Sequence, residues 1–119
     1  MTETFISFYL SRMAIRIPRS ALRGIGDPKF VRFLVKNDGT SLIMEPNVRM
    51  DLKSHRVPLH KGEHWKLEIT STRLCRLLQS KTGWVDGESY RVPGLVYVNQ
   101  RKAVFDLESA ETIPRVIGV

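Results

Sequence analysis

The chain has 119 residues, which fits one compact domain and hardly two. Hydrophobic residues make up 42% of it and charged residues 26%, a balance that excludes a largely disordered chain and predicts an ordered core. No apolar stretch approaches the roughly 18 residues needed to span a bilayer, so we expect no membrane partner. The formal net charge is +7, and this excess of positive charge attracts polyanions.

The positive charge is concentrated near the N-terminus. Between Arg12 and Lys36 there are seven basic residues and one acid, Asp27, so nearly the whole excess lies in about a fifth of the chain. Such a segment is typical of proteins that contact nucleic-acid phosphates. The alternative is a solvated basic face that only aids solubility, and charge alone favours neither interpretation.

The first half predicts two strands followed by a helical turn. The strands are expected at Thr4–Leu10 and Ala14–Ile17. In the second of them apolar and basic residues alternate, so Ile15 and Ile17 should face the core and Arg16 the solvent. Pro18 has no N–H and should end the ladder of hydrogen bonds.

A helical turn and a hairpin are expected next. The helical turn is predicted at Ser20–Ile25, with Arg19 and Arg23 on one solvated face because they are four residues apart. A strand at Phe30–Lys36 precedes Asp-Gly, the strongest short-range hairpin signal, and Leu42–Met44 returns as its partner, closed by Pro46. Residues 47–64 are polar and basic and predict an irregular connector.

The second half repeats this order of elements. A strand is expected at Leu67–Ile69, then a helix through Arg73–Leu78 that Thr70 or Ser71 caps with its hydroxyl. Further strands are expected at Ser89–Val98 and Ala103–Leu107, and Pro93-Gly94 should interrupt the pairing of the first of these or form a bulge.

The repeated order predicts one domain, residues 1–119, built from two similar units. Unit one covers about residues 4–46 and unit two about 65–110; Ile17 and Leu22 match Ile69 and Leu74 at an offset of 52. A hairpin alone buries too little surface to be stable, so the units must pair with each other. The predicted fold class is mainly β with short helices, a barrel built from two pseudo-repeats in one chain. The alternative is an accidental pattern match.

The segment Ala14–Pro46 resembles the AbrB/MazE/SpoVT swapped-hairpin family. The residues that carry the resemblance are Ile15-Arg16-Ile17-Pro18, Leu22-Arg23, Ile25-Gly26 and Asp38-Gly39 within a hairpin, and the second half is a looser echo. The resemblance implies a swapped-hairpin β-barrel, intertwined dimers and DNA binding, often in transcription regulators or antitoxins. It also implies that Arg23 matches a helix arginine that contacts DNA. Leu22 stands where the family commonly has a second helix arginine, and Arg16 and Arg19 are expected to take over its role.

The resulting functional hypothesis is a cytoplasmic, non-enzymatic transcription regulator that needs no cofactor and binds duplex DNA as a homo-oligomer. The predicted DNA-contacting residues are Arg12, Arg16, Arg19, Arg23, Lys29, Arg73 and Arg76. The alternative is an inhibitor or adaptor, for example of mobile-element origin, that binds a protein partner through the same basic surface. The lone Cys75 excludes an intrachain disulfide, which fits a reducing compartment.

Two further patterns are weaker. His60-Lys61-Gly62-Glu63-His64 matches the H-x-x-E-H pattern of a zinc protease, but that motif needs a helix, which Gly62 and the preceding Pro58 disfavour. A chance match is the better interpretation, so no metal is expected. Cys75, flanked by leucines, is expected to be buried rather than nucleophilic, and Trp65, Trp84 and Tyr90 are expected in the core rather than stacked on bases.

Overall fold

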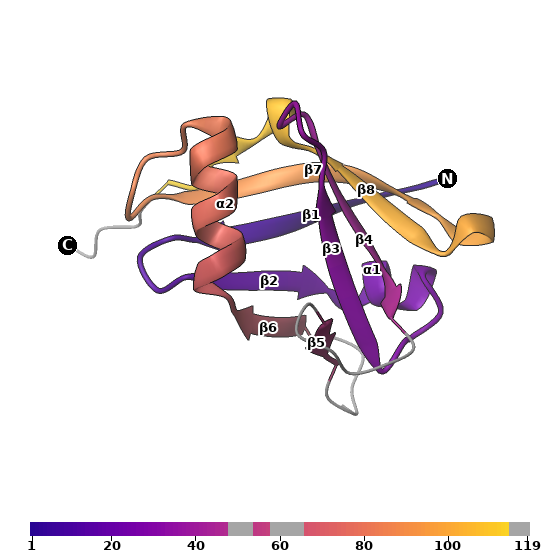
Figure 1. Cartoon of the computed structure of the whole chain (residues 1–119). Helices are drawn as coiled ribbons and strands as arrows, with labels where there is room; N and C mark the ends of the chain where they lie inside the picture. Colours follow the sequence, from indigo (N-terminus) through magenta and orange to yellow (C-terminus); the bar gives the residue numbers. More distant parts are fainter. Residues whose placement is uncertain (48–53, 58–65, 115–119) are drawn as a thin grey trace.

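One antiparallel sheet contains every strand of residues 1–47, 54–57 and 66–114, the part of the chain that the computed structural model describes (Figure 1). The strands are β1 (Thr2–Tyr9), β2 (Ala14–Pro18), β3 (Phe30–Val35), β4 (Ser41–Asn47), β5 (Ser54–Arg56), β6 (Lys66–Thr70), β7 (Ser89–Tyr97), β8 (Lys102–Asp106) and β9 (Glu111–Thr112). The helices are α1 (Arg19–Gly24) and α2 (Thr72–Thr82), and the short 3-10 helices are Val98–Gln100 and Leu107–Ser109.

The strands follow the order β5-β3-β4-β8-β7-β1-β2-β6, with β9 added to β7. The sheet curls into a nearly closed barrel, and α2 lies across one end of it (Figure 1). The expected fold class, mainly β with short helices and a barrel-shaped sheet, is therefore confirmed.

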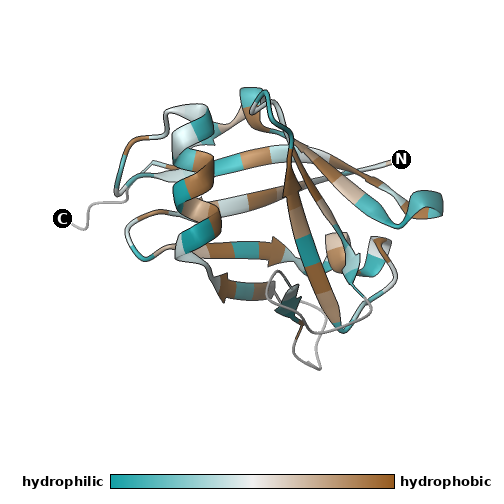
Figure 2. Ribbon diagram, in the orientation of Figure 1, coloured by the Kyte–Doolittle hydropathy of each residue, from teal (hydrophilic) through white to brown (hydrophobic). Residues whose placement is uncertain are grey.

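The interior of the barrel is filled by the apolar residues of alternating strands. Ile15 and Ile17 of β2 have no exposed surface, as the alternation predicted, and Arg16 between them is partly exposed. Figure 2 shows the alternation as brown and teal bands along β2. The core also takes Leu22 from α1 and Cys75 from α2, so both helices are fixed to the barrel by burial.

The N-terminal cap of α2 and the turn of the first hairpin form where the sequence predicted them. Ser71 caps α2, because its hydroxyl accepts a hydrogen bond from the N–H of Leu74 at 3.2 Å. Gly83 ends the helix in the left-handed conformation with φ of 78°. Gly39, with φ of 74°, turns the chain between β3 and β4.

The two halves of the chain exchange strands with each other. Six of the seven strand pairings along the strand order are kept when β1 to β4 are replaced by β5 to β8 and the reverse; only β1–β2 has no β5–β6 counterpart in the described residues. Equivalent strands pair directly, β2 with β6 and β4 with β8. The first strand of each half pairs with the hairpin of the other half, β1 with β7 and β5 with β3. Each half of the chain therefore adds its first strand to the hairpin of the other half.

The hairpin tips are exchanged in the same way. At the β3–β4 tip, the carbonyl of Asn37 accepts a hydrogen bond from Lys81 Nζ in the last turn of α2 at 3.1 Å. At the β7–β8 tip, Arg101 donates from Nε to the carbonyl of Ile25, which ends α1, at 3.4 Å. A cationic side chain thus joins each hairpin tip to the helix of the opposite half.

The prediction that Pro93-Gly94 interrupts β7 is wrong. The pairing with β1 continues from Ser89 to Val96, with Phe5 opposite Pro93 and Thr4 opposite Gly94. On its other side β7 pairs with β9 only up to Arg91 and with β8 only from Gly94 onward. Pro93 lies in the gap between these two ladders, where no partner strand needs its missing N–H. A Cβ at Gly94 would lie 2.5 Å from Phe105, so close strand contact explains the glycine.

The connector and the end of the first hairpin also differ from expectation. Residues 54–56 within the connector form β5, which pairs with the start of β3. Strand β4 does not close at Pro46 but continues to Asn47. Its pairing with β8 stops at Met44, so Pro46 has a neighbouring strand on one side only and its missing N–H is tolerated there.

Equivalent isoleucines in the two halves should differ in their effect on stability. Ile17 is completely buried, whereas Ile69 only packs against the edge of the core. We expect Ile17→Ala to lower the free energy of unfolding by about 2–5 kcal/mol and Ile69→Ala by clearly less, because the second change leaves a smaller cavity. Urea unfolding measures both values. Equal losses would contradict the difference in burial, provided that the two variants keep the same dependence on urea.

Candidate nucleic-acid interface

The basic residues singled out from the sequence lie at two opposite ends of β2. Helix α1 follows Pro18 directly, which places the α1 end of the molecule at the last residue of the strand. At the other end the N–H of Ser71 donates to the carbonyl of Met13 at 3.0 Å, so the start of α2 lies beside the β1–β2 loop. Figure 1 shows the two helices near opposite ends of β2. The α1 end carries Arg19, Arg23 and Lys29; the α2 end carries Arg12, Arg16, Arg73 and Arg76.

Arg12 and Arg16 share one carboxylate at the α2 end. Glu68 Oε1 accepts from Arg12 Nη2 at 2.8 Å and from Arg16 Nη2 at 3.1 Å. Arg16 and Glu68 are also cross-strand partners in β2 and β6. The hydrogen bond from Arg12, followed by that from Arg16, lowers the pKa of Glu68. Two guanidinium groups therefore face a single negative charge, and one positive charge is left over.

The same two arginines lie over one aromatic ring. The guanidinium carbon of Arg12 is 4.5 Å from the centre of the Tyr9 ring, and that of Arg16 is 5.1 Å from it. Such contacts hold a guanidinium group in place through the electron-rich face of the ring, while its N–H groups stay available at the edge. Tyr9 thus orders both side chains without neutralising them.

Sequence reasoning missed a third arginine on this surface. Ser7 lies opposite Arg16 in β2 on one side and opposite Arg91 in β7 on the other, so all three share the outer face of the sheet. The guanidinium carbon of Arg91 is 4.5 Å from the centre of the Phe5 ring. We call Arg12, Arg16 and Arg91, with Tyr9, Phe5 and Glu68, the arginine face. Alternation along β7 could have placed Arg91 outside the barrel, but nothing local shows that β7 lies next to β1.

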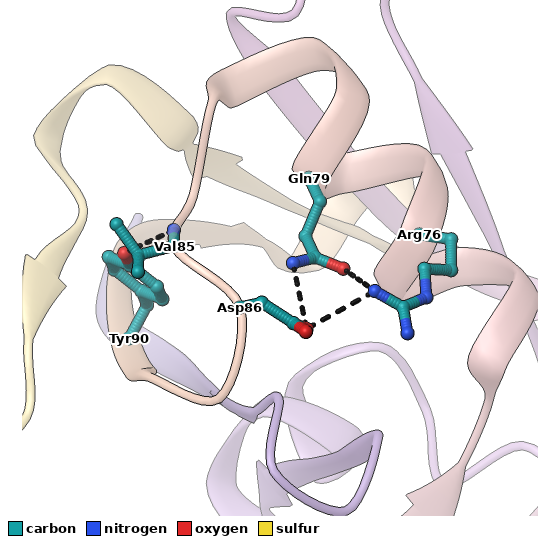
Figure 3. Close-up of polar contacts among 5 residues, drawn as sticks. All are labelled: Arg76, Gln79, Val85, Asp86 and Tyr90. Carbon is teal, nitrogen blue, oxygen red and sulfur yellow. Dashed lines mark hydrogen bonds and ion pairs between the residues drawn. The ribbon is translucent and has the colours of Figure 1, made fainter.

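Arg76 is engaged in fixing a loop (Figure 3). Its Nη1 donates to Gln79 Oε1 at 2.9 Å and lies 3.2 Å from Asp86 Oδ1 in the loop after α2. The same loop is held on its other side by the N–H of Val85, which donates to the Tyr90 hydroxyl at 2.8 Å. Arg76 is therefore a weaker candidate for an external anion than its exposure suggests, whereas Arg73 is exposed on the first turn of α2.

The α1 end carries the remaining basic residues singled out from the sequence. Helix α1 buries Ala21 and Leu22, and Arg23 and Lys29 are exposed. Arg19, expected on one solvated face with Arg23, is only partly exposed. It is the first residue of the helix and directly follows Pro18, the last residue of β2. The contacts of Arg12 and Arg16 with Tyr9 and of Arg91 with Phe5 all belong to the arginine face.

Other candidate chemistry has little support in the described part of the chain. Across residues 1–47, 54–57 and 66–114, no three His, Cys, Asp or Glu side chains gather in a way that could hold a metal ion. The His60–His64 motif and Trp65 lie outside these residues. Cys75 is buried, and burial raises the pKa of its thiol to about 11. Trp84 stacks on Tyr90 with ring centres 4.6 Å apart, which confirms a packing role.

No helix in the described residues is long and apolar enough to cross a bilayer. A comparison of the chain with protein-family models, with curated proteins and with solved structures finds no match.

The shared carboxylate gives a testable titration. We expect Glu68 to titrate below the usual range of a glutamate, and Arg12→Ala to raise its pKa more than Arg16→Ala, because Arg12 makes the stronger hydrogen bond. Since the folded pKa is lowered, the small stabilisation from this pair is present above the unfolded pKa and is lost as the pH falls through the folded value. Carboxyl NMR measures the titration. Equal values in wild type and Arg12→Ala would contradict the geometry.

Proposed function

We propose that the protein is a DNA-binding regulator of AbrB-like type that contacts duplex phosphates through the arginine face. The observation that carries the proposal is the pair Arg12 and Arg16, which lie over one tyrosine and share one carboxylate. The pair keeps a net positive charge and a fixed geometry. Fixed arginines lose less side-chain freedom when an anion binds than arginines that are free in solution.

The spacing of the arginines suits a phosphate backbone. Arg16 and Arg91 are separated by β1, so their strands lie roughly 10 Å apart. Two guanidinium groups at about this separation can contact different phosphates along one backbone. Contacts of this type position a protein on DNA but carry no sequence information, so selectivity requires further residues that contact base edges.

Glu68 regulates the charge of this surface in the proposal. It neutralises one of the two arginines in the free protein, and a bound phosphate competes with it for the same N–H groups. Removing its charge should therefore strengthen DNA binding. A purely structural role for the three side chains predicts no such gain.

The proposal is tested by binding of a fluorescent duplex at several salt concentrations. We expect Arg12→Ala/Arg16→Ala to reduce the slope of log affinity against log salt by about 2, because each lost phosphate contact removes roughly 0.9. Arg91→Ala should reduce it by about 1 and Glu68→Gln should raise the affinity. An unchanged slope in the double variant would remove the arginine face as the binding surface.

Matched variants locate the interface. Arg76→Ala removes a charge that is engaged with Asp86, so we expect little effect on binding. Arg23→Ala/Lys29→Ala removes two exposed charges at the α1 end; a large loss in this variant alone would place the interface there. Wild-type binding that is weak and indifferent to DNA sequence would favour the protein-binding inhibitor or adaptor instead.

A further inference from the structure

A row of apolar side chains lies on the outer face of the four central strands. Leu34 of β3 is opposite Ile43 of β4, Ile43 is opposite Val104 of β8, and Val104 is opposite Leu95 of β7. Directly opposed residues share one face of a sheet, and the neighbours of Ile43 and Val104 along their strands are buried in the core. Leu34 is 40% exposed, and the other three are partly exposed. We call these four residues the apolar row.

The apolar row departs from the usual pattern of an antiparallel sheet. A sheet that packs one face on the core normally presents polar residues on the other. Strands β4 and β8 each have a paired strand on both sides, so no further strand can add to them. A partner on this surface must therefore pack against the face of the sheet.

The exchange symmetry of the barrel also relates the two ends of the apolar row. When one half of the chain is superimposed on the other, Ile43 takes the place of Val104 and Leu34 the place of Leu95. Leu34 is opposite Ile43 in the first hairpin just as Leu95 is opposite Val104 in the second, and the two hairpins meet at Ile43 and Val104. A two-fold dimer uses the same surface patch on both copies, and a row that is apolar at both ends suits such a contact. A copy turned over onto the row brings an apolar side chain against each apolar side chain.

The charges around the apolar row favour the same partner. On one side lie Lys36 and Asp106, and on the other lie Lys102 and the ion pair of Arg32 with Glu45, whose Nε and Oε1 are 2.6 Å apart. Both signs are present, so two copies can place opposite charges against each other.

The shape of the surface supplies a place for the most exposed leucine. A hollow of about 480 Å³ is lined by Leu95, Val104, Pro93, Tyr97 and Gly94 on one part and by the polar residues Glu3, Thr4, Ser41 and Asp106 on the rest. It lies at the Leu95 end of the apolar row, and Leu34 protrudes at the other end. We propose that two copies of the chain form a homodimer through the apolar row, with Leu34 of each copy entering the hollow beside Leu95 of the other.

This proposal rests on other side chains than DNA binding: the two surfaces share β7, but Arg91 of the arginine face lies four residues before Leu95 of the apolar row. The contact covers four strands, a face roughly 20 Å wide, so it belongs to the small class of specific interfaces and should dissociate in the micromolar range. Sedimentation equilibrium of the full chain from about 1 to 500 μM measures this association. A wild-type protein that stays monomeric throughout would overturn the proposal.

Substitutions identify the surface. Ile43→Glu and Val104→Glu should each raise the dissociation constant of the dimer by about 30-fold or more, because a charge would be buried at the centre of the contact. Both side chains are outside the core, so the melting temperature should change little. Leu34→Ala, at the edge of the sheet, should raise the dissociation constant of the dimer by about tenfold. If a glutamate variant fails to fold, this milder variant decides whether the apolar row is the interface.

The control replaces an exposed apolar residue elsewhere. Val85, in the loop after α2, is 61% exposed and lies on none of the four strands that carry the apolar row. We expect Val85→Glu to leave the dimer unchanged. A dimer that withstands Leu34→Ala and Val104→Glu but is lost in Val85→Glu would show that the copies meet at another surface.

Discussion

Neither half of this chain can cover its own strands, and this constraint determines the rest of the structure. A two-stranded hairpin leaves most of its apolar face in water. Here the hairpin of each half gains the first strand of the other half, β1 on β7 and β5 on β3, and the hairpins join through β4 and β8. The core forms inside a sheet to which both halves contribute, and the lysine and arginine contacts at the hairpin tips repeat the exchange at the helix ends.

The barrel leaves two outer surfaces of different chemistry. On β2, β1 and β7 the outward positions carry arginines that lie over aromatic rings, with one glutamate between two of them. On β3, β4 and β8 the outward positions carry aliphatic side chains bordered by charges of both signs. The core takes up only the inward positions of the strands. The outward positions can therefore differ in chemistry from one part of the outer face to another. The two proposed partners, a polyanion and a second copy of the chain, would contact different side chains.

Local sequence signals predicted local structure well. The alternation around Ile15 and Ile17, the hydroxyl cap of Ser71 and the glycine turn at Gly39 each depend on neighbouring residues, and the structure contains all three. Features that depend on distant strands were not predictable in this way. The pairing at Pro93 was expected to break. Proline is tolerated there because β9 pairs with β7 only before this residue and β8 only after it, which no local pattern reveals. The neighbourhood of Arg16 and Arg91 depends on β1 lying between them, which no pattern near either residue reveals.

The pairing of β1 with β7 has a consequence for synthesis of the protein. Thr2 lies opposite Val96, and residues 2–6 of β1 pair with β7 alone, so this part of β1 gains its partner only after β7 has been translated. Contacts between such distant residues also slow folding, because the loop must close before the contact stabilises it. During that interval the apolar residues of β1 remain accessible to chaperones or to other nascent chains. Residues 2–6 of β1 therefore stay unpaired until β7 has emerged and the barrel can close.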